Sequence, residues 1–147
     1  MLKNIPDIIS PELMYALMSM GHGDEICFGD ANFPADSMGQ RVIRADGHKI
    51  TELLDAVLQL FPLDAFVQKP CVLMDAPVGN EPAVWGKYEK IIRENDFAGG
   101  FKHGFEKMER FDFYDRAKEC YAIVATGEYE GYSNIILKKQ LHLCLSH

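Results

Sequence analysis

The residues most able to carry chemistry lie in two short segments on either side of one predicted strand. The first segment, Gly21-His22-Gly23, places a histidine between two glycines directly after a predicted helix. Glycines let the backbone turn sharply and leave room for a ligand to approach the imidazole ring. Because an imidazole titrates near neutral pH, His22 is a candidate general acid or base. An ordinary loop histidine explains the segment equally well.

The second segment begins with Asp30, which follows the predicted strand and opens the loop Ala31-Asn32-Phe33-Pro34. Ligands of α/β proteins commonly bind beyond the carboxyl ends of strands, where a carboxylate can accept hydrogen bonds from a polar substrate. An Asx turn that caps the loop is an equally good interpretation of this residue. The residues alone therefore leave both roles of Asp30 open.

Two later segments carry groups that suit a sugar. Arg110 has forked donors that can bind a hydroxyl or a carboxylate, although an exposed arginine at a strand edge is the commoner case. Tyr132, Ser133 and Asn134 combine an aromatic face, a hydroxyl and an amide, which can stack on C–H bonds and bond hydroxyls. On composition alone, a plain turn explains this last segment better.

Several common chemistries lack their sequence signatures. The chain has no glycine-rich nucleotide loop, no GxSxG and no HExxH, so nucleotide binding, serine hydrolysis and zincin chemistry are unsupported. The four cysteines lie far apart among apolar neighbours, and we expect buried reduced thiols. His142 and Cys144 lie close together near the C-terminus, but two such groups do not make a zinc site. We therefore expect no metal.

Composition and charge narrow the remaining classes. The hydrophobic fraction of 48% and charged fraction of 25% are those of an ordinary globular protein, which argues against disorder and membrane insertion. The net charge of −7 disfavours nucleic acid as a partner. The first residues, 1–7, have neither the charged head nor the apolar run of a secretory signal. We expect a cytoplasmic protein without membrane association.

The apolar pattern predicts an α/β fold in which helices cover a sheet of short strands. A chain of 147 residues has room for one domain, which we place at residues 1–147. Ser10-Pro11-Glu12 is typical of a helix N-terminus, and Gly21 ends that helix. Helices are predicted at residues 11–20, 50–61, 83–95 and 113–120, a loop at 30–40, and strands at 26–29, 41–44, 71–74, 105–111, 121–125 and 135–138.

A series of segments, in order over almost the whole chain, forms one recognisable pattern. The segments are Ser10-Pro11-Glu12-Leu13, Met20-Gly21-His22-Gly23-Asp24-Glu25-Ile26, Asp30-Ala31-Asn32-Phe33-Pro34, Ile43-Arg44-Ala45-Asp46-Gly47, Arg110-Phe111 with Phe113-Tyr114-Asp115-Arg116-Ala117, Ala125-Thr126-Gly127-Glu128, and Asn134-Ile135-Ile136-Leu137-Lys138-Lys139. Together they resemble the RbsD/FucU family of sugar mutarotases. Phe33-Pro34 and Arg110 favour its fucose branch over its ribose branch.

The resemblance implies an α/β fold that assembles into a ring-forming homo-oligomer, a homodecamer, and acts on the monosaccharide L-fucose without metal or cofactor. It also implies that the residue matching His22 is the general acid or base. Asp30, Arg110, Tyr132, Ser133 and Asn134 match positions that bind the sugar. On this hypothesis His22 moves the proton, Asp30 and Arg110 hold hydroxyls, and Tyr132 assists at the ring oxygen.

Two residues depart from the family pattern, since Ser133 and Gln140 stand where glycine is usual, and the tail 141–147 has no counterpart. Ser133 could add a hydroxyl contact or narrow the pocket, and at a positive φ it would cost about 1 kcal/mol. Three rival hypotheses stay open: a sugar-binding module without catalysis, a D-ribose pyranase-type enzyme, and a metal-dependent sugar isomerase, for which the sequence supplies no ligand set.

Overall fold

The computed structural model describes residues 1–140, whose strands form one six-stranded sheet in the order β2-β5-β1-β6-β3-β4. Five strands run parallel to one another, and only β6 runs antiparallel, between β1 and β3. The carboxyl ends of five strands therefore meet the amino end of β6 at one edge of the sheet. The strands are β1 (Glu25–Gly29), β2 (Val42–Ala45), β3 (Cys71–Met74), β4 (Glu106–Met108), β5 (Ala122–Thr126) and β6 (Ile135–Lys138).

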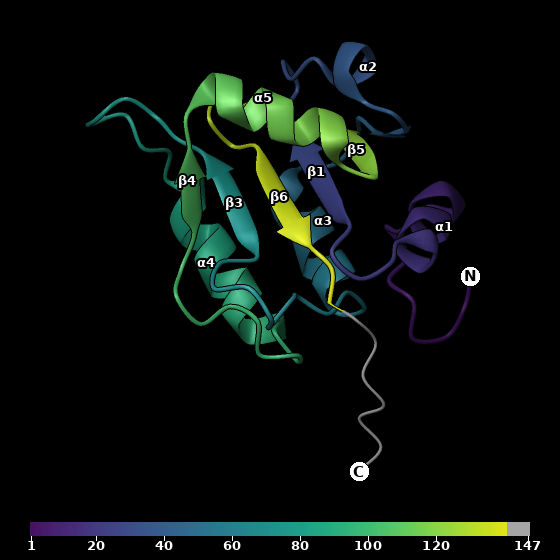
Figure 1. Ribbon diagram of the computed structural model, residues 1–147. Helices are drawn as coiled ribbons and strands as arrows, with labels where there is room; N and C mark the ends of the chain where they lie inside the picture. Colours follow the sequence, from purple (N-terminus) through teal and green to yellow (C-terminus); the bar gives the residue numbers. More distant parts are fainter. Residues whose placement is uncertain (141–147) are drawn as a thin grey trace.

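Helices cover both faces of the sheet and complete three layers (Figure 1). α5 crosses one face together with the short α2, and their buried residues share one apolar cluster. α3 and α4 pack against each other on the opposite face, where α1 joins a second, larger cluster. The helices are α1 (Pro11–Ser19), α2 (Ala35–Met38), α3 (Ile50–Leu58), α4 (Val84–Asn95) and α5 (Arg110–Glu119).

The central strands are apolar on both faces because each face is covered by helices. On β1, Ile26 and Phe28 belong to the cluster under α3 and α4, whereas Cys27 between them faces α5. This alternation follows from the strand geometry, in which successive side chains point to opposite faces. β3 shows the same burial along its whole length, as the apolar run Cys71–Met74 predicts. Each fully buried Val, Leu, Ile, Phe or Met side chain stabilises the folded state by about 1.5–3 kcal/mol.

Most predicted elements are present with small shifts at their ends, but two predictions are wrong. The segment predicted as a loop over 30–40 contains α2, whose single turn is too short to show helical periodicity. The strand predicted over 105–111 ends at Met108, and Arg110 is the first residue of α5 rather than part of a strand edge. The helix starts there because the Glu109 carboxylate accepts hydrogen bonds from two backbone N–H groups of the first turn.

The N-terminal helix begins and ends as the sequence predicts. The Ser10 hydroxyl accepts from the Leu13 N–H at 3.1 Å, and Pro11 occupies the first turn. At the other end, Lys139 Nζ donates to the carbonyl oxygens of Leu17 and Met20, at 2.8 and 2.6 Å. These bonds satisfy helix-terminal carbonyls and attach α1 to the end of β6. No helix within residues 1–140 is long and apolar enough to cross a membrane.

Candidate functional site

Asp30 lies at the carboxyl end of β1 and is held there by the neighbouring strand. Its backbone N–H donates to Asn134 Oδ1 at 2.7 Å, and its own Oδ1 accepts from the Asn32 N–H at 3.0 Å. The second bond is an Asx turn, so the capping role considered for this residue is present. Only 9% of Asp30 is exposed. This geometry presents a fixed carboxylate beside the amide of Asn134.

Burial changes the acidity of this carboxylate. Desolvation raises the pKa of Asp30, and the negative charge of nearby Glu128 raises it further, while hydrogen bonds from backbone N–H groups, including those of Asn32 and Phe33, lower it. The net direction is upward, so Asp30 holds its proton more tightly than an exposed aspartate does. The group can accept a hydroxyl hydrogen bond once it is ionised.

The segment that carries Tyr132, Ser133 and Asn134 forms a tight turn before β6. Tyr132 has a φ of 58°, and its carbonyl accepts from Trp85 Nε1 at 2.9 Å. The positive φ thus falls on Tyr132, so the strain considered for Ser133 does not arise at that residue. Ser133 is buried, its hydroxyl donates to the Glu130 carbonyl at 2.6 Å, and this bond closes the turn.

Arg110 reaches the same edge of the sheet from the first residue of α5. It lines a cavity of about 390 Å³ together with Tyr132, in the size range of small-molecule sites. The guanidinium carbon lies 4.8 Å from the ring centroid of Phe111, a distance typical of a cation–π contact. The other lining residues are Asp75, Ala76, Pro77, Glu109 and Phe111. We call this space the Arg110 cavity.

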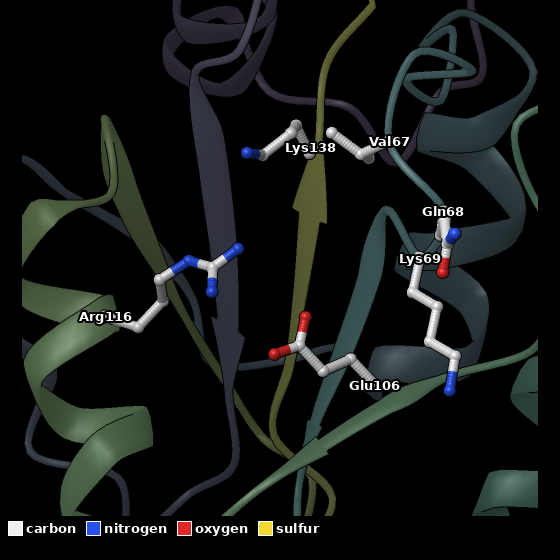
Figure 2. A pocket seen from close by; sticks show the side chains of 6 residues that line it. All are labelled: Val67, Gln68, Lys69, Glu106, Arg116 and Lys138. Atoms are coloured by element: carbon white, nitrogen blue, oxygen red, sulfur yellow. The ribbon is translucent and has the colours of Figure 1, made fainter.

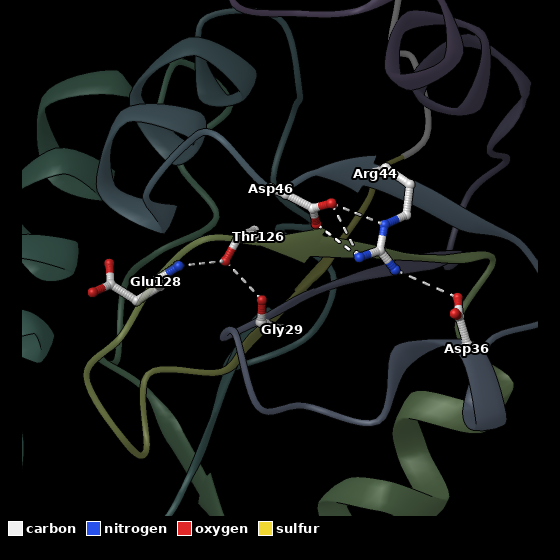
Figure 3. A network of polar contacts seen from close by, with 6 residues as sticks. All are labelled: Gly29, Asp36, Arg44, Asp46, Thr126 and Glu128. Atoms are coloured by element: carbon white, nitrogen blue, oxygen red, sulfur yellow. Dashed lines mark hydrogen bonds and ion pairs between the residues drawn. The ribbon is translucent and has the colours of Figure 1, made fainter.

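Two residues that sequence reasoning did not single out connect the strand ends. Thr126 Oγ1 donates to the Gly29 carbonyl at 2.7 Å and accepts from the Glu128 N–H at 3.3 Å (Figure 3). The Glu128 carbonyl accepts from the Ala31 N–H at 2.7 Å, directly after Asp30. Both are buried polar residues at the end of a strand, Thr126 as the last residue of β5 and Glu128 two residues later, and polar residues at a strand end are the signal that could have identified them. They fix the position of the Asp30 loop.

A glycine makes this connection possible. A Cβ on Gly127 would overlap the backbone carbonyl of Asp46, so no larger residue fits between the two turns. Around Asp46 the Arg44 guanidinium forms ion pairs with the carboxylates of Asp46 and Asp36, at 2.9 and 3.6 Å (Figure 3). These pairs are exposed and contribute little to stability. They border a second cavity of about 290 Å³ on the α2 side of Asp30.

His22 lies at the opposite end of β1 from all these groups. The turn that carries it is fixed by Gly23, which has a φ of 85° and donates its N–H to the Lys139 carbonyl at 2.9 Å. The imidazole is exposed and meets the ring of Phe66 edge to face, with the centroids 5.6 Å apart. Residues Glu25–Gly29 separate it from Asp30. One chain therefore brings together Asp30, Arg110, Tyr132, Ser133 and Asn134 at one edge, but not His22.

A polar cavity of about 290 Å³ lies on the sheet face near the start of β1, and Figure 2 shows the side chains around it. Arg116 of α5 donates two hydrogen bonds of 2.6 Å to the Glu25 carboxylate, and these bonds raise the pKa of Arg116. Lys138 of β6 lies 4.0 Å from the same carboxylate. The charges of Arg116 and Lys138 beside this cavity are thus partly neutralised by Glu25.

Neither metal ligands nor reactive thiols accompany the site in the described part of the chain. Within residues 1–140, no three His, Cys, Asp or Glu side chains are grouped to hold a metal ion. Cys27, Cys71 and Cys120 are buried free thiols, as predicted, and burial raises the pKa of each. His142 and Cys144 lie outside the described residues.

Comparison with known proteins assigns the family. The chain matches the RbsD / FucU transport protein family over residues 3–141. It belongs to this family. The fucose mutarotase of Mus musculus is 49% identical over 146 residues, which cover 94% of this chain and 93% of the relative. The L-fucose mutarotase of Haemophilus influenzae (strain 86-028NP) is 48% identical over 141 residues, 95% of this chain and 96% of the relative.

Solved structures of the RbsD/FucU family have the same fold. The crystal structure of the fucose mutarotase from Streptococcus pneumoniae in complex with L-fucose has a TM-score of 0.90 and 46% identity, covering 97% of this chain and all of that one. The Bacillus subtilis RbsD complexed with D-ribose has a TM-score of 0.74 at 19% identity over 97% of this chain and 100% of that chain, which shows a common fold only. The predicted similarity to the fucose branch is confirmed by these identities.

Proposed function

We propose that this protein is an L-fucose mutarotase, an isomerase that interconverts the α and β anomers of L-fucose. The observation that carries the proposal is that Asp30, Asn134, Arg110 and Tyr132 lie at one edge of the sheet, in a chain about half identical to named fucose mutarotases. Arg110 and Tyr132 line one cavity there, and Asp30, bonded to Asn134, lines another. The whole chain, residues 1–147, acts as one mutarotase domain in the cytoplasm, and it needs no cofactor.

The reaction requires proton transfer, reversible breaking of the ring C–O bond, and rotation of the open form. A base removes the proton of the anomeric hydroxyl while an acid protonates the ring oxygen, the ring C–O bond breaks, and the free aldehyde rotates and recloses. One positioned acid–base group accelerates such a step by roughly 10²–10⁴-fold. His22 is the group we assign to this transfer, Asp30 and Arg110 hold hydroxyls, and Tyr132 assists at the ring oxygen.

His22 serves a site on another copy of the chain. This follows from the proposed roles, because β1 holds His22 and Asp30 of one chain at opposite ends of the strand. The surface beside His22 supports the assembly: α1, which directly precedes the His22 turn, borders an apolar cavity of about 640 Å³ with exposed Tyr15 and Met18. Monomers rarely expose a large continuous apolar patch. We infer a ring-shaped homo-oligomer, a decamer.

The assembly can be tested at Met18, which is 76% exposed. Met18→Glu should leave the folded chain intact, because exposed substitutions change stability by roughly 0.5 kcal/mol or less. It should lower the oligomeric mass in sedimentation and reduce activity in parallel. An exposed control on another surface is Val78→Glu, which should change neither. A monomeric Met18→Glu variant with full activity would contradict the shared site.

The activity itself is tested by magnetisation exchange between the α and β anomer signals of L-fucose, with D-ribose measured beside it. We expect faster exchange for L-fucose and a loss of roughly 10²–10⁴-fold in His22→Ala. The exposed His103→Ala is the matched control and should behave as the parent protein does. Unchanged exchange in His22→Ala would disprove the role of His22. Binding without faster exchange would indicate a sugar-binding module, and acceleration of ribose alone would indicate the ribose branch.

A further inference from the structure

We propose that an apolar wall of the Arg110 cavity, formed by Ala76, Pro77 and Phe111, binds the C6 methyl group of the sugar and so selects 6-deoxy hexoses. The inference rests on the proposed function, because it concerns which part of L-fucose meets which part of the cavity. It assigns a role in substrate specificity to Ala76, Pro77 and Phe111, which take no part in the proposed proton transfer.

Each acidic group around the cavity has one carboxylate oxygen bonded to the backbone. The Glu109 carboxylate accepts from the N–H groups of Phe111 and Asp112, at 2.9 and 3.3 Å. Asp75 Oδ1 accepts from the N–H of Ala76 at 3.0 Å. Arg110 and Tyr132 are the further lining residues with polar side chains, and the rest of the described lining is apolar. The cavity thus combines hydroxyl-binding groups with a surface that cannot bond a hydroxyl.

Phe111 is the main element of this wall. It is 60% exposed although it is a large apolar side chain. The Arg110 guanidinium lies over its ring, and Tyr114 meets the ring edge to face with the centroids 6.1 Å apart. Because Phe111 is the second residue of a capped helix, its backbone is fixed as well. An exposed ring held in this way offers a rigid apolar surface to a ligand.

The chemistry of L-fucose matches such a surface. The sugar has a methyl group where most hexoses have a hydroxymethyl group, so it offers one apolar corner among its hydroxyls. A methyl group against Phe111 and Pro77 removes apolar surface from water, which is favourable. A hydroxyl in the same place would lose water without gaining a partner from the wall. The wall therefore favours the 6-deoxy sugar, both by burying its methyl group and by leaving a hydroxyl of other hexoses without a partner.

The test compares three sugars of one ring configuration. L-fucose carries the methyl group, D-arabinose has hydrogen in its place, and L-galactose has a hydroxymethyl group. Phe111→Ala should lower kcat/KM of anomer exchange about tenfold for L-fucose, the low end of what a methylene is worth in an apolar pocket. D-arabinose should lose clearly less than L-fucose, because it has no methyl group to lose contact and shares only the effect on Arg110, whose guanidinium lies over the Phe111 ring. Phe97→Ala, at a position 55% exposed outside the cavity, should change neither.

A second variant keeps the proposal falsifiable if Phe111→Ala folds poorly. Ala76→Ser places a hydroxyl in the wall and should raise the L-galactose to L-fucose ratio of kcat/KM. Equal losses for L-fucose and D-arabinose in Phe111→Ala, or an unchanged ratio in Ala76→Ser, would overturn the methyl assignment. Failure of the proposed function looks different, because the parent protein would then not accelerate L-fucose exchange at all.

Discussion

Mixing two inactive variants should restore activity if each site takes its histidine and its carboxylate from different copies of the chain. His22→Ala lacks the proposed acid–base group, and Asp30→Asn lacks the carboxylate. In one chain these residues flank the five-residue strand β1. At about 3.3 Å per residue, the strand alone spans roughly 17 Å. A general base must approach the proton it moves to within about 3 Å, and one sugar ring cannot bridge the difference.

The expected yield follows from counting intact sites. In a random one-to-one mixture, half of the sites have an intact Asp30, and half of those meet an intact His22 on the neighbouring copy. About a quarter of the parent activity should therefore return, since each shared site draws on two independent copies. His22→Ala alone should keep less than about 1% if acid–base help is worth 10²–10⁴-fold. Asp30→Asn alone should be well below a quarter of the parent activity, because it lacks the carboxylate that holds a sugar hydroxyl.

The assay is anomer exchange of L-fucose after the two variants are refolded together. In the control, His22→Ala is mixed with a double variant that carries both His22→Ala and Asp30→Asn. Neither chain then has an intact His22, so the mixture should stay inactive. Native mass spectrometry should show that the two chains share oligomers. If mixed oligomers form and activity stays at the level of the single variants, His22 and Asp30 do not act across a subunit contact, and the reasoning is refuted.

The site makes three further predictions. Glu128→Gln removes a charge that raises the pKa of Asp30, so the acid limb of the pH–rate profile should move to lower pH. Because the pKa of Asp30 is higher in the folded than in the unfolded protein, the free energy of unfolding decreases as the pH rises from the ordinary aspartate pKa through the raised one. Urea melts over this pH range should show a smaller decrease in Glu128→Gln than in the parent protein. Asn134→Ala leaves the buried Asp30 N–H without its acceptor and should lower the free energy of unfolding by about 1–3 kcal/mol. Gly127→Ala places a Cβ against the backbone carbonyl of Asp46 and should lower the melting temperature. The matched control is Gly86→Ala in α4, where a Cβ has open space, and it should raise the free energy of unfolding by up to about 1 kcal/mol.

The layers of the fold could be predicted from the sequence because buried faces of helices and strands require apolar residues at regular spacings. The stripe that includes Ile50, Leu54 and Val57 has the helical period, and all three side chains are buried in α3. The run Cys71–Met74 has the length and composition of a strand covered on both faces, which β3 is. The pattern gave no warning of α2, because four residues are fewer than two helical turns.

Asp30 and Asn134 could be named as candidates from the sequence, but the reason why they meet could not. Asp30 and Asn134 are 104 positions apart, and they meet because β6 runs antiparallel beside β1. Strand order depends on long-range packing, which local sequence patterns do not encode. The same limit explains Thr126 and Glu128, whose roles become visible only when the ends of β1 and β5 lie side by side.

His22 is the residue that a single chain does not bring to Asp30, although the two are close in the sequence. His22 and Asp30 are eight positions apart in the sequence. In a helix, their backbone positions would be about 12 Å apart, and in a hairpin they could be much closer. Here the intervening segment is an extended strand with all but its first residue buried, so it cannot fold back. The turn at Gly23 then fixes the histidine at the far edge of the sheet. If His22 is the acid–base group, catalysis requires a contact between copies, and assembly itself becomes part of the active site.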